Sequence, residues 1–204
     1  MQAIVLARRD IKENDQIVSF YTLEKGKVEL LARGVKKITS KNSAHLEPFS
    51  FVDVEVTEGK EINYLTKVHP INYFISIRKN LEKSLAAGFL VSTLNKLLHE
   101  GENDERIFNL TIGWLEYLSL ESSVCRLQLL DAFFVKFLSL LGFDITEMKN
   151  VVGTAKEDLM FLGKSSWEEN NNFEYKKSLH NFIYKFLLYN TDRNIKDWGK
   201  IKLG

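Results

Sequence analysis

The stretch that decides the fold of the N-terminal part is Val-Asp-Val-Glu-Val-Thr at residues 52–57, in which apolar and polar residues alternate strictly. Such alternation indicates a β-strand with one face in a core and the other in water. Other short apolar segments read as strands at residues 3–7, 16–22, 27–32 and 62–68. The turn between the second and third contains Gly26, which can take a positive φ. Short strands so close together predict a small closed barrel, because closure removes exposed sheet edges.

After Pro70 the apolar residues recur every three to five positions, which is typical of helices. We expect helices at residues 81–98, 104–120, 126–141 and 175–189. The third is apolar on most sides, as a buried central helix is. The segment at about 144–172 is polar and weakly patterned, so a loop-rich region with at most short elements is expected there. The predicted fold class is α+β: a five-stranded barrel in residues 1–75, followed by an all-helical domain in residues 76–204.

The composition excludes several classes of protein. Of the 204 residues 45% are hydrophobic and 27% charged, which is the balance of a folded globular chain. The one cysteine, Cys125, excludes a disulfide framework and a zinc site built on paired thiolates, and we interpret it as a small buried hydrophobe. The longest apolar segment, 129–143, is interrupted by Asp131 and Lys136 and is too short to cross a membrane. We therefore expect a soluble, cytoplasmic protein without membrane contact.

No catalytic motif is found in the sequence. A glycine-rich phosphate loop, GxSxG and HExxH are all absent, and the four histidines are scattered along the chain. Asp53 and Glu55 share one face of a strand, but two solvated carboxylates explain them without acid–base chemistry. We expect a protein that is not an enzyme and that needs no metal or other cofactor.

The charge distribution is more informative than the net charge of +1. Residues 30–46 contain four basic residues and no acidic one, together with a glycine and several hydroxyl and amide side chains. Phosphate groups are bound by such a mixture, and loops that leave barrel strands are where such folds bind oligonucleotides. The candidate DNA-binding residues are Arg8, Arg9, Lys25, Lys27, Arg33, Lys36, Lys37 and Lys41. The alternative is a solvated basic loop without a partner, and the pattern alone does not decide between the two.

These residues also carry a family resemblance. The turn Arg-Gly-Val-Lys-Lys at 33–37, the segment Leu-Glu-Pro-Phe-Ser at 46–50 and the strand that follows resemble the bacterial RecO recombination-mediator family. The order of elements agrees over most of the chain, including the Leu-Leu-Gly-Phe segment at 140–143. The resemblance implies an OB-fold barrel, binding to single- and double-stranded DNA and annealing of complementary strands. It further implies help in loading recombinase onto strands coated by single-strand-binding protein.

The sequence departs from the family pattern at one place. Many relatives carry a four-cysteine zinc site after the Leu-Gly-Phe element, whereas residues 144–172 contain no cysteine. We therefore expect no zinc. Partner contacts that relatives make through this module, the RecR protein included, are left open.

Two kinds of contact follow from the DNA-binding hypothesis. Tyr21 and Tyr64 could stack on bases, although strand aromatics more often belong to a core. The acidic, aromatic-ended C-terminal tail of single-strand-binding protein would need an apolar pocket beside a cation, and the central helix offers candidates for both. These partner-binding candidates are Arg126, Leu130, Phe134 and Lys136. Arg126 and Lys136 could equally be ordinary charges on a helix surface.

The DNA-binding hypothesis requires the positive side chains to gather on one wall of the barrel, without acidic residues interleaved among them. The competing hypothesis is a protein-interaction scaffold whose barrel does not bind nucleic acid, and the near-zero net charge favours it. The two differ in whether the chain has a salt-sensitive affinity for DNA.

Overall fold

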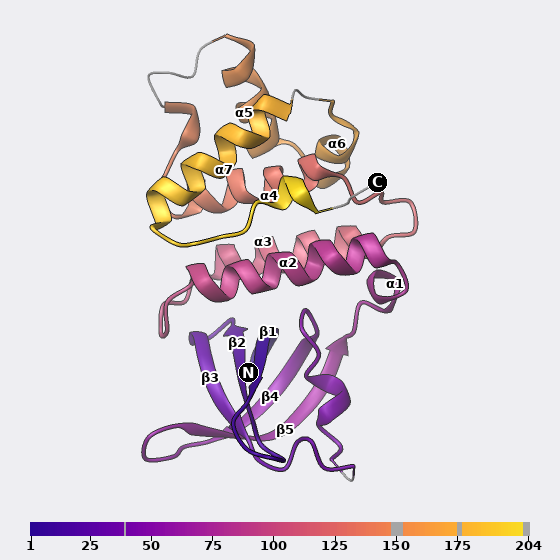
Figure 1. The fold of residues 1–204 in the computed structure, drawn as a ribbon, viewed down its shortest axis with the longest axis vertical. Helices are drawn as coiled ribbons and strands as arrows, with labels where there is room; N and C mark the ends of the chain where they lie inside the picture. Colours follow the sequence, from indigo (N-terminus) through magenta and orange to yellow (C-terminus); the bar gives the residue numbers. More distant parts are fainter. Residues whose placement is uncertain (39, 148–152, 175–176, 202–204) are drawn as a thin grey trace. The chain divides into compact units, whose positions relative to one another are not determined.

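The computed structural model describes residues 1–38, 40–147, 153–174 and 177–201. It begins with five strands and continues with helices (Figure 1). The strands are β1 (Gln2–Asp10), β2 (Gln16–Thr22), β3 (Gly26–Ala32), β4 (Phe51–Thr57) and β5 (Asn63–Asn72). The α-helices are α1 (Ile75–Arg78), α2 (Leu81–Leu97), α3 (Glu105–Ser119), α4 (Leu127–Leu140), α5 (Thr154–Lys164), α6 (Trp167–Asn172) and α7 (Lys177–Thr191). Short 3-10 helices are η1 (Ser43–His45), η2 (Ile145–Glu147) and η3 (Trp198–Lys200).

The strands close into a barrel in the order β1-β2-β3-β5-β4, as the alternating pattern predicts (Figure 1). The pairing of β3 with β5 is parallel, through Leu30 with Asn63 and Leu31 with Tyr64, and the other pairs are antiparallel. The interior is filled by small and branched apolar side chains from all five strands. The predicted fold class, a five-stranded barrel followed by helices, is therefore confirmed.

The chain divides into two compact units whose limits differ from the expected boundary. The first unit joins Met1–Ile75 with Ala87–Phe108, and the second joins Ser76–Ala86 with Asn109–Gly204. Within the first unit, the ring of Phe108 contacts Tyr21 and Phe51, with ring centroids 6.1 and 6.0 Å apart. The segment 87–108 thus belongs with the barrel, which a change of periodicity at Pro70 could not indicate.

The second unit is built around α4, the helix that we expected to be central. Nine of its fourteen residues are buried, including Phe133, Phe134 and Phe137. The side-chain N–H of Trp114 on α3 donates to the Leu129 carbonyl at 3.1 Å. Cys125, just before α4, is 2% exposed, and burial raises the pKa of its thiol to about 12. This matches its interpretation as a buried hydrophobe.

The expectation of a loop-rich region at 144–172 is wrong for the described residues. The helices α5 and α6 occupy most of it, and residues 148–152 lie outside the described part of the chain, as does the predicted start of the last helix at Tyr175. Only Leu159 and Leu162 of α5 are buried, so its apolar stripe is too narrow to stand out in the sequence. The start of α6 is fixed by a capping box between Ser166 and Glu169.

Among the described residues, none of the helices combines the length and the apolar character needed to cross a bilayer.

Candidate nucleic-acid interface

The basic loop after β3 is anchored to the barrel. Val35 is 3% exposed and packs in the barrel core. The backbone N–H of Gly34 donates to Asp15 Oδ1 at 2.7 Å, and that of Lys36 donates to the Asn14 carbonyl at 3.1 Å. Gly34 has a φ of +62°, which glycine adopts without strain. The turn therefore has a fixed conformation, and the lysines beside Val35 lie at the surface.

The strand register separates the predicted DNA-binding residues into two groups. Arg8 and Arg9 pair with residues near the start of β2, at the end where β3 leads from Ala32 into the basic loop. Lys25 and Lys27 belong to the β2–β3 turn, at the opposite end of the same strands. We call Arg8 and Arg9, together with the cations of the basic loop that leaves this end of β3, the loop-end cations: Arg8, Arg9, Arg33, Lys36, Lys37 and Lys41.

Acidic side chains are interleaved among the loop-end cations. Ion pairs join Arg8 to Glu47 at 2.6 Å, Arg9 to Glu29 at 3.2 Å and Lys36 to Asp10 at 2.6 Å. The hydrogen bond from Lys36 lowers the pKa of the Asp10 carboxyl below its ordinary value. The requirement of a wall of unopposed positive charge is therefore not met at Arg8, Arg9 and Lys36. Their partners lie far away in the sequence, which is why the acid-free segment 30–46 did not reveal them.

These ion pairs contribute too little free energy to prevent the same cations from binding a phosphate. The paired side chains are partly exposed, and exposed pairs contribute about 0–1 kcal/mol. A phosphate can take the place of a carboxylate at a similarly small cost. Lys37 and Lys41 are exposed and form no ion pair within the described part of the chain. They are the loop-end cations most accessible to a polyanion.

The structure places Lys27 apart from the loop-end cations and engages its amine with backbone carbonyls. Its Nζ donates to the carbonyls of Asn95 at 2.5 Å and Leu98 at 3.3 Å, at the C-terminal end of α2. A cation at this position satisfies the last carbonyls of the helix and complements its dipole. Lys25 is exposed at the turn but lies away from the loop-end cations.

Of the two aromatic candidates, Tyr21 is not available to bases. It is 1% exposed, burial raises the pKa of its hydroxyl to about 12, and it bonds to the backbone of Asp104. Tyr64 is half-buried, and the guanidinium carbon of Arg33 lies 4.4 Å from its ring centroid. Arg33 also donates to the Tyr64 hydroxyl at 3.0 Å.

The structure does not place the residues of the predicted partner groove on α4 at an open surface. Leu130 and Phe134 are completely buried, so they cannot line a surface. The Nζ of Lys136 donates to the carbonyls of Gly163 at 2.9 Å and Ser165 at 2.7 Å, and burial lowers its pKa. Lys136 is therefore used inside the unit, where it satisfies carbonyls at the C-terminal end of α5.

Arg126 has a similar internal role. Its guanidinium donates to the Asn171 carbonyl at 3.2 Å, so it ties the end of α6 to the start of α4. Local sequence patterns predict both charges at a surface, because they do not indicate that α5 and α6 pack against α4.

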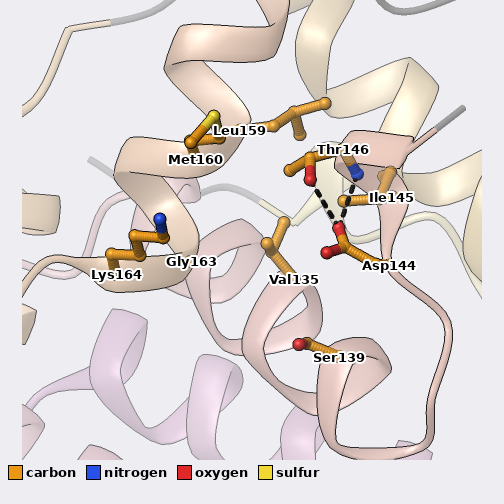
Figure 2. Close-up of a pocket in the computed structure, with 9 residues that line it drawn as sticks. All are labelled: Val135, Ser139, Asp144, Ile145, Thr146, Leu159, Met160, Gly163 and Lys164. Atoms are coloured by element: carbon orange, nitrogen blue, oxygen red, sulfur yellow. Dashed lines mark hydrogen bonds between the residues drawn. The ribbon is translucent and has the colours of Figure 1, made fainter.

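A cavity that the sequence did not indicate lies in the same unit, between α4, η2 and α5 (Figure 2). Its volume is about 150 Å³. Asp144 Oδ1 accepts hydrogen bonds from the backbone and hydroxyl of Thr146 at 2.8 and 2.7 Å, which closes one side. The lining residues are Val135, Ser139, Asp144, Ile145, Thr146, Leu159, Met160, Gly163 and Lys164. Apolar side chains and one lysine thus line a cavity together with polar ones, but its walls come from α4, η2 and α5 rather than from α4 alone.

No group of three or more His, Cys, Asp or Glu side chains among the described residues is arranged to hold a metal ion.

Comparison with protein families gives two matches that follow one another along the chain. Residues 1–74 match the model "Recombination protein O N terminal", and residues 78–168 match "Recombination protein O C terminal". The first covers all five strands, and the second reaches from α1 into α6.

Curated relatives agree with these matches. A protein named DNA repair protein RecO from Geobacter sulfurreducens is 35% identical over 57% of this chain and 48% of its own length. One of the same name from Desulforamulus reducens is 29% identical over 70% of this chain and 54% of its own, so the chain spans about half the length of these two relatives. The relative from Thermoanaerobacter sp. is 28% identical over 98% of this chain and 85% of its own. With a closed N-terminal barrel, a helical remainder and both family matches in sequence order, this chain belongs to the RecO family.

Proposed function

We propose that this chain, within the DNA repair role of its family, binds single- and double-stranded DNA through the loop-end cations and anneals complementary strands. The observation that carries the proposal is the anchored loop 33–41, which presents Lys37 and Lys41 to solvent without acidic partners among the described residues. The ion-paired Arg8, Arg9 and Lys36 would exchange a carboxylate for a phosphate when DNA arrives.

The proposed annealing mechanism is electrostatic. Two complementary strands repel each other through their phosphates. A protein that places cations along one strand releases bound counterions and lowers this repulsion, and no nucleotide or metal is needed. If the protein neutralises about four phosphates, a plot of the logarithm of the single-strand affinity against the logarithm of the salt concentration should have a slope of about −3.

We predict that Lys37→Ala/Lys41→Ala binds a fluorescent single strand about tenfold more weakly at low salt and makes the salt slope shallower by about 1.4. The reason is the loss of two phosphate contacts. Fluorescence anisotropy over a salt series measures both quantities. The same variant should anneal complementary fluorescent oligonucleotides more slowly, with and without single-strand-binding protein.

The matched control for this variant is Lys25→Ala, an exposed lysine at the opposite end of the strands. It should leave affinity and slope unchanged. If the wild-type protein has no salt-sensitive affinity for DNA, the scaffold hypothesis takes the place of the proposal. If both variants weaken binding equally, the loop-end cations are not the site.

The proposal includes the acidic, aromatic-ended tail of single-strand-binding protein as a partner, bound at the cavity of Figure 2. A cavity of about this size accommodates a ring as large as benzene. Lys164 beside the apolar walls supplies a cation for the terminal carboxylate. This contact would deliver the protein to coated strands, where recombinase is loaded. The proposal leaves the RecR protein open as a partner.

We predict that Lys164→Ala binds a labelled tail peptide about tenfold more weakly than the wild type, because the carboxylate loses its charged partner. Titration by anisotropy measures this. Arg126→Ala is the matched control, since that cation bonds to the Asn171 carbonyl and does not line the cavity. Equal binding by Lys164→Ala and the wild type would remove the cavity from the proposal.

A further inference from the structure

Arg33 differs from the other loop-end cations in what holds it. Its guanidinium lies over the ring of Tyr64 and donates to the hydroxyl of the same residue at 3.0 Å. Arg8, Arg9 and Lys36 are held by carboxylates. Arg33 is therefore held by a neutral partner, and it forms no ion pair with the residues that the structure describes.

Tyr64 is itself held by a barrel strand and by one loop of the barrel. Tyr64 lies on β5 next to Leu31 of β3, so the ring is beside the start of the basic loop. On the β4–β5 loop, a Cβ at Gly59 would lie 2.7 Å from Tyr64 Cε2 and 2.1 Å from the Ile62 carbonyl oxygen. Only glycine lets this loop lie so close to the ring.

Arg33 remains accessible on the ring. The residue is exposed although its guanidinium carbon lies over the tyrosine ring, so part of the planar group meets solvent. The side chain of Lys37 runs past Gly34 in the same turn, because its carbons lie 3.5–4.0 Å from where a Cβ of Gly34 would be. One turn therefore combines a flat cation, suited to the face of a base, with a flexible cation, suited to a phosphate.

We propose that Arg33, held on the ring of Tyr64, is the stacking surface for an unpaired base. A guanidinium plane stacks on any nucleobase, and the aromatic ring beneath orders it before the ligand arrives. Bases inside a duplex are already stacked on each other and cannot use this surface. The site thus favours single strands over duplex, and this inference rests on the proposed DNA binding.

The test compares two fluorescent strands of the same length and phosphate number, an oligothymidylate and an abasic strand. The wild-type protein should bind the oligothymidylate about five- to tenfold more tightly. Arg33→Lys keeps the charge and removes the plane, so it should bind both strands with similar affinity and with an unchanged salt slope. Lys37→Ala should weaken binding to both strands by the same factor.

Tyr64→Leu provides a second route, since it removes the ring and leaves Arg33 in place. It should lose the preference for the oligothymidylate, whereas Tyr64→Phe should keep most of it. Thermal unfolding confirms that each variant is folded. If the wild type binds neither strand, the proposed function fails. If it binds both equally, or if Arg33→Lys keeps the preference, DNA binding stands and the stacking inference is overturned.

Discussion

Replacing Asp131 by alanine is expected to lower the free energy of unfolding by about 3–5 kcal/mol. Asp131 on α4 is completely buried, and its Oδ1 accepts hydrogen bonds from His180 Nδ1 at 2.9 Å and from the Trp198 indole N–H at 2.7 Å. The other ring nitrogen of His180 is 2.8 Å from Asp197 Oδ1. One carboxylate thus joins α4, α7 and η3, and its removal leaves two buried donors without an acceptor.

Urea unfolding of the full chain measures this change. The matched control is Glu116→Ala, which removes an exposed carboxylate from α3 and should change the free energy of unfolding by less than about 0.5 kcal/mol. Asp131→Asn keeps one acceptor oxygen, so it should lower the free energy of unfolding by less than Asp131→Ala does. A loss below about 1 kcal/mol for Asp131→Ala would mean that the C-terminal segment with Trp198 is held by packing alone.

The same cluster makes stability depend on pH. Desolvation acts to lower the pKa of His180, but the hydrogen bonds and charges of Asp131 and Asp197 outweigh it and raise the pKa above 6.5. Desolvation raises the pKa of Asp131. Desolvation also acts to raise the pKa of Asp197, but the hydrogen bonds from His180 and the Gly199 backbone, together with nearby positive charge, outweigh it and lower that pKa. Lys200 adds to the lowering at Asp197.

A histidine whose pKa is raised by folding stabilises the protein fully below its unfolded value. Above pH 6.5 the native state keeps a proton that the unfolded chain has lost, so stability should fall by at most about 1.4 kcal/mol per pH unit until the folded pKa is passed. His180→Gln should remove this slope. An equal slope in wild type and variant would assign the pH dependence to other groups.

The barrel could be predicted from the sequence because the information is local. Each strand carries its own apolar pattern, and strict alternation at Val52, Val54 and Val56 has one simple structural solution. β1 is harder to identify as a strand from its sequence pattern, since Ile4 and Leu6 are buried on the face opposite to Ala3 and Val5. A strand covered on both faces loses its alternation and reads as a plain apolar run.

The differences between the expected and the observed surroundings of the cations share one physical cause, which is contact between residues far apart in the sequence. Lys136 and Lys27 have the sequence character of surface lysines, yet both donate to carbonyls at helix ends. Neither the position of these helix ends nor the carboxylate of Glu47 near Arg8 can be inferred from neighbouring residues. A charge pattern predicts where a cation is on the chain, and only the tertiary structure tells which cations remain available to a ligand.

Gly26→Ala should be the most damaging small substitution in the barrel unit, with an expected loss of about 2–5 kcal/mol. Gly26 has a φ of +65°, which costs alanine about 1–2 kcal/mol. The added Cβ would also lie 2.0 Å from the Glu102 carbonyl oxygen and 2.7 Å from the Asn103 backbone nitrogen. Backbone atoms cannot rotate away as side chains can, so the loop around Glu102 must move, at a further cost of about 1–3 kcal/mol.

The two contributions can be separated with a glycine elsewhere in the same unit. Gly101 has a φ of +77°, and a Cβ there would meet nothing within 4 Å, so Gly101→Ala should cost only the conformational part, about 1–2 kcal/mol. Displacing the loop would also break the Tyr21 hydroxyl bonds to Asp104. Urea unfolding of both variants, with tyrosine ionisation followed as a local probe, should give the larger loss and the earlier ionisation for Gly26→Ala. Equal losses would show that the turn can shift without disturbing the segment 87–108, and that this segment is not needed to hold the barrel in shape.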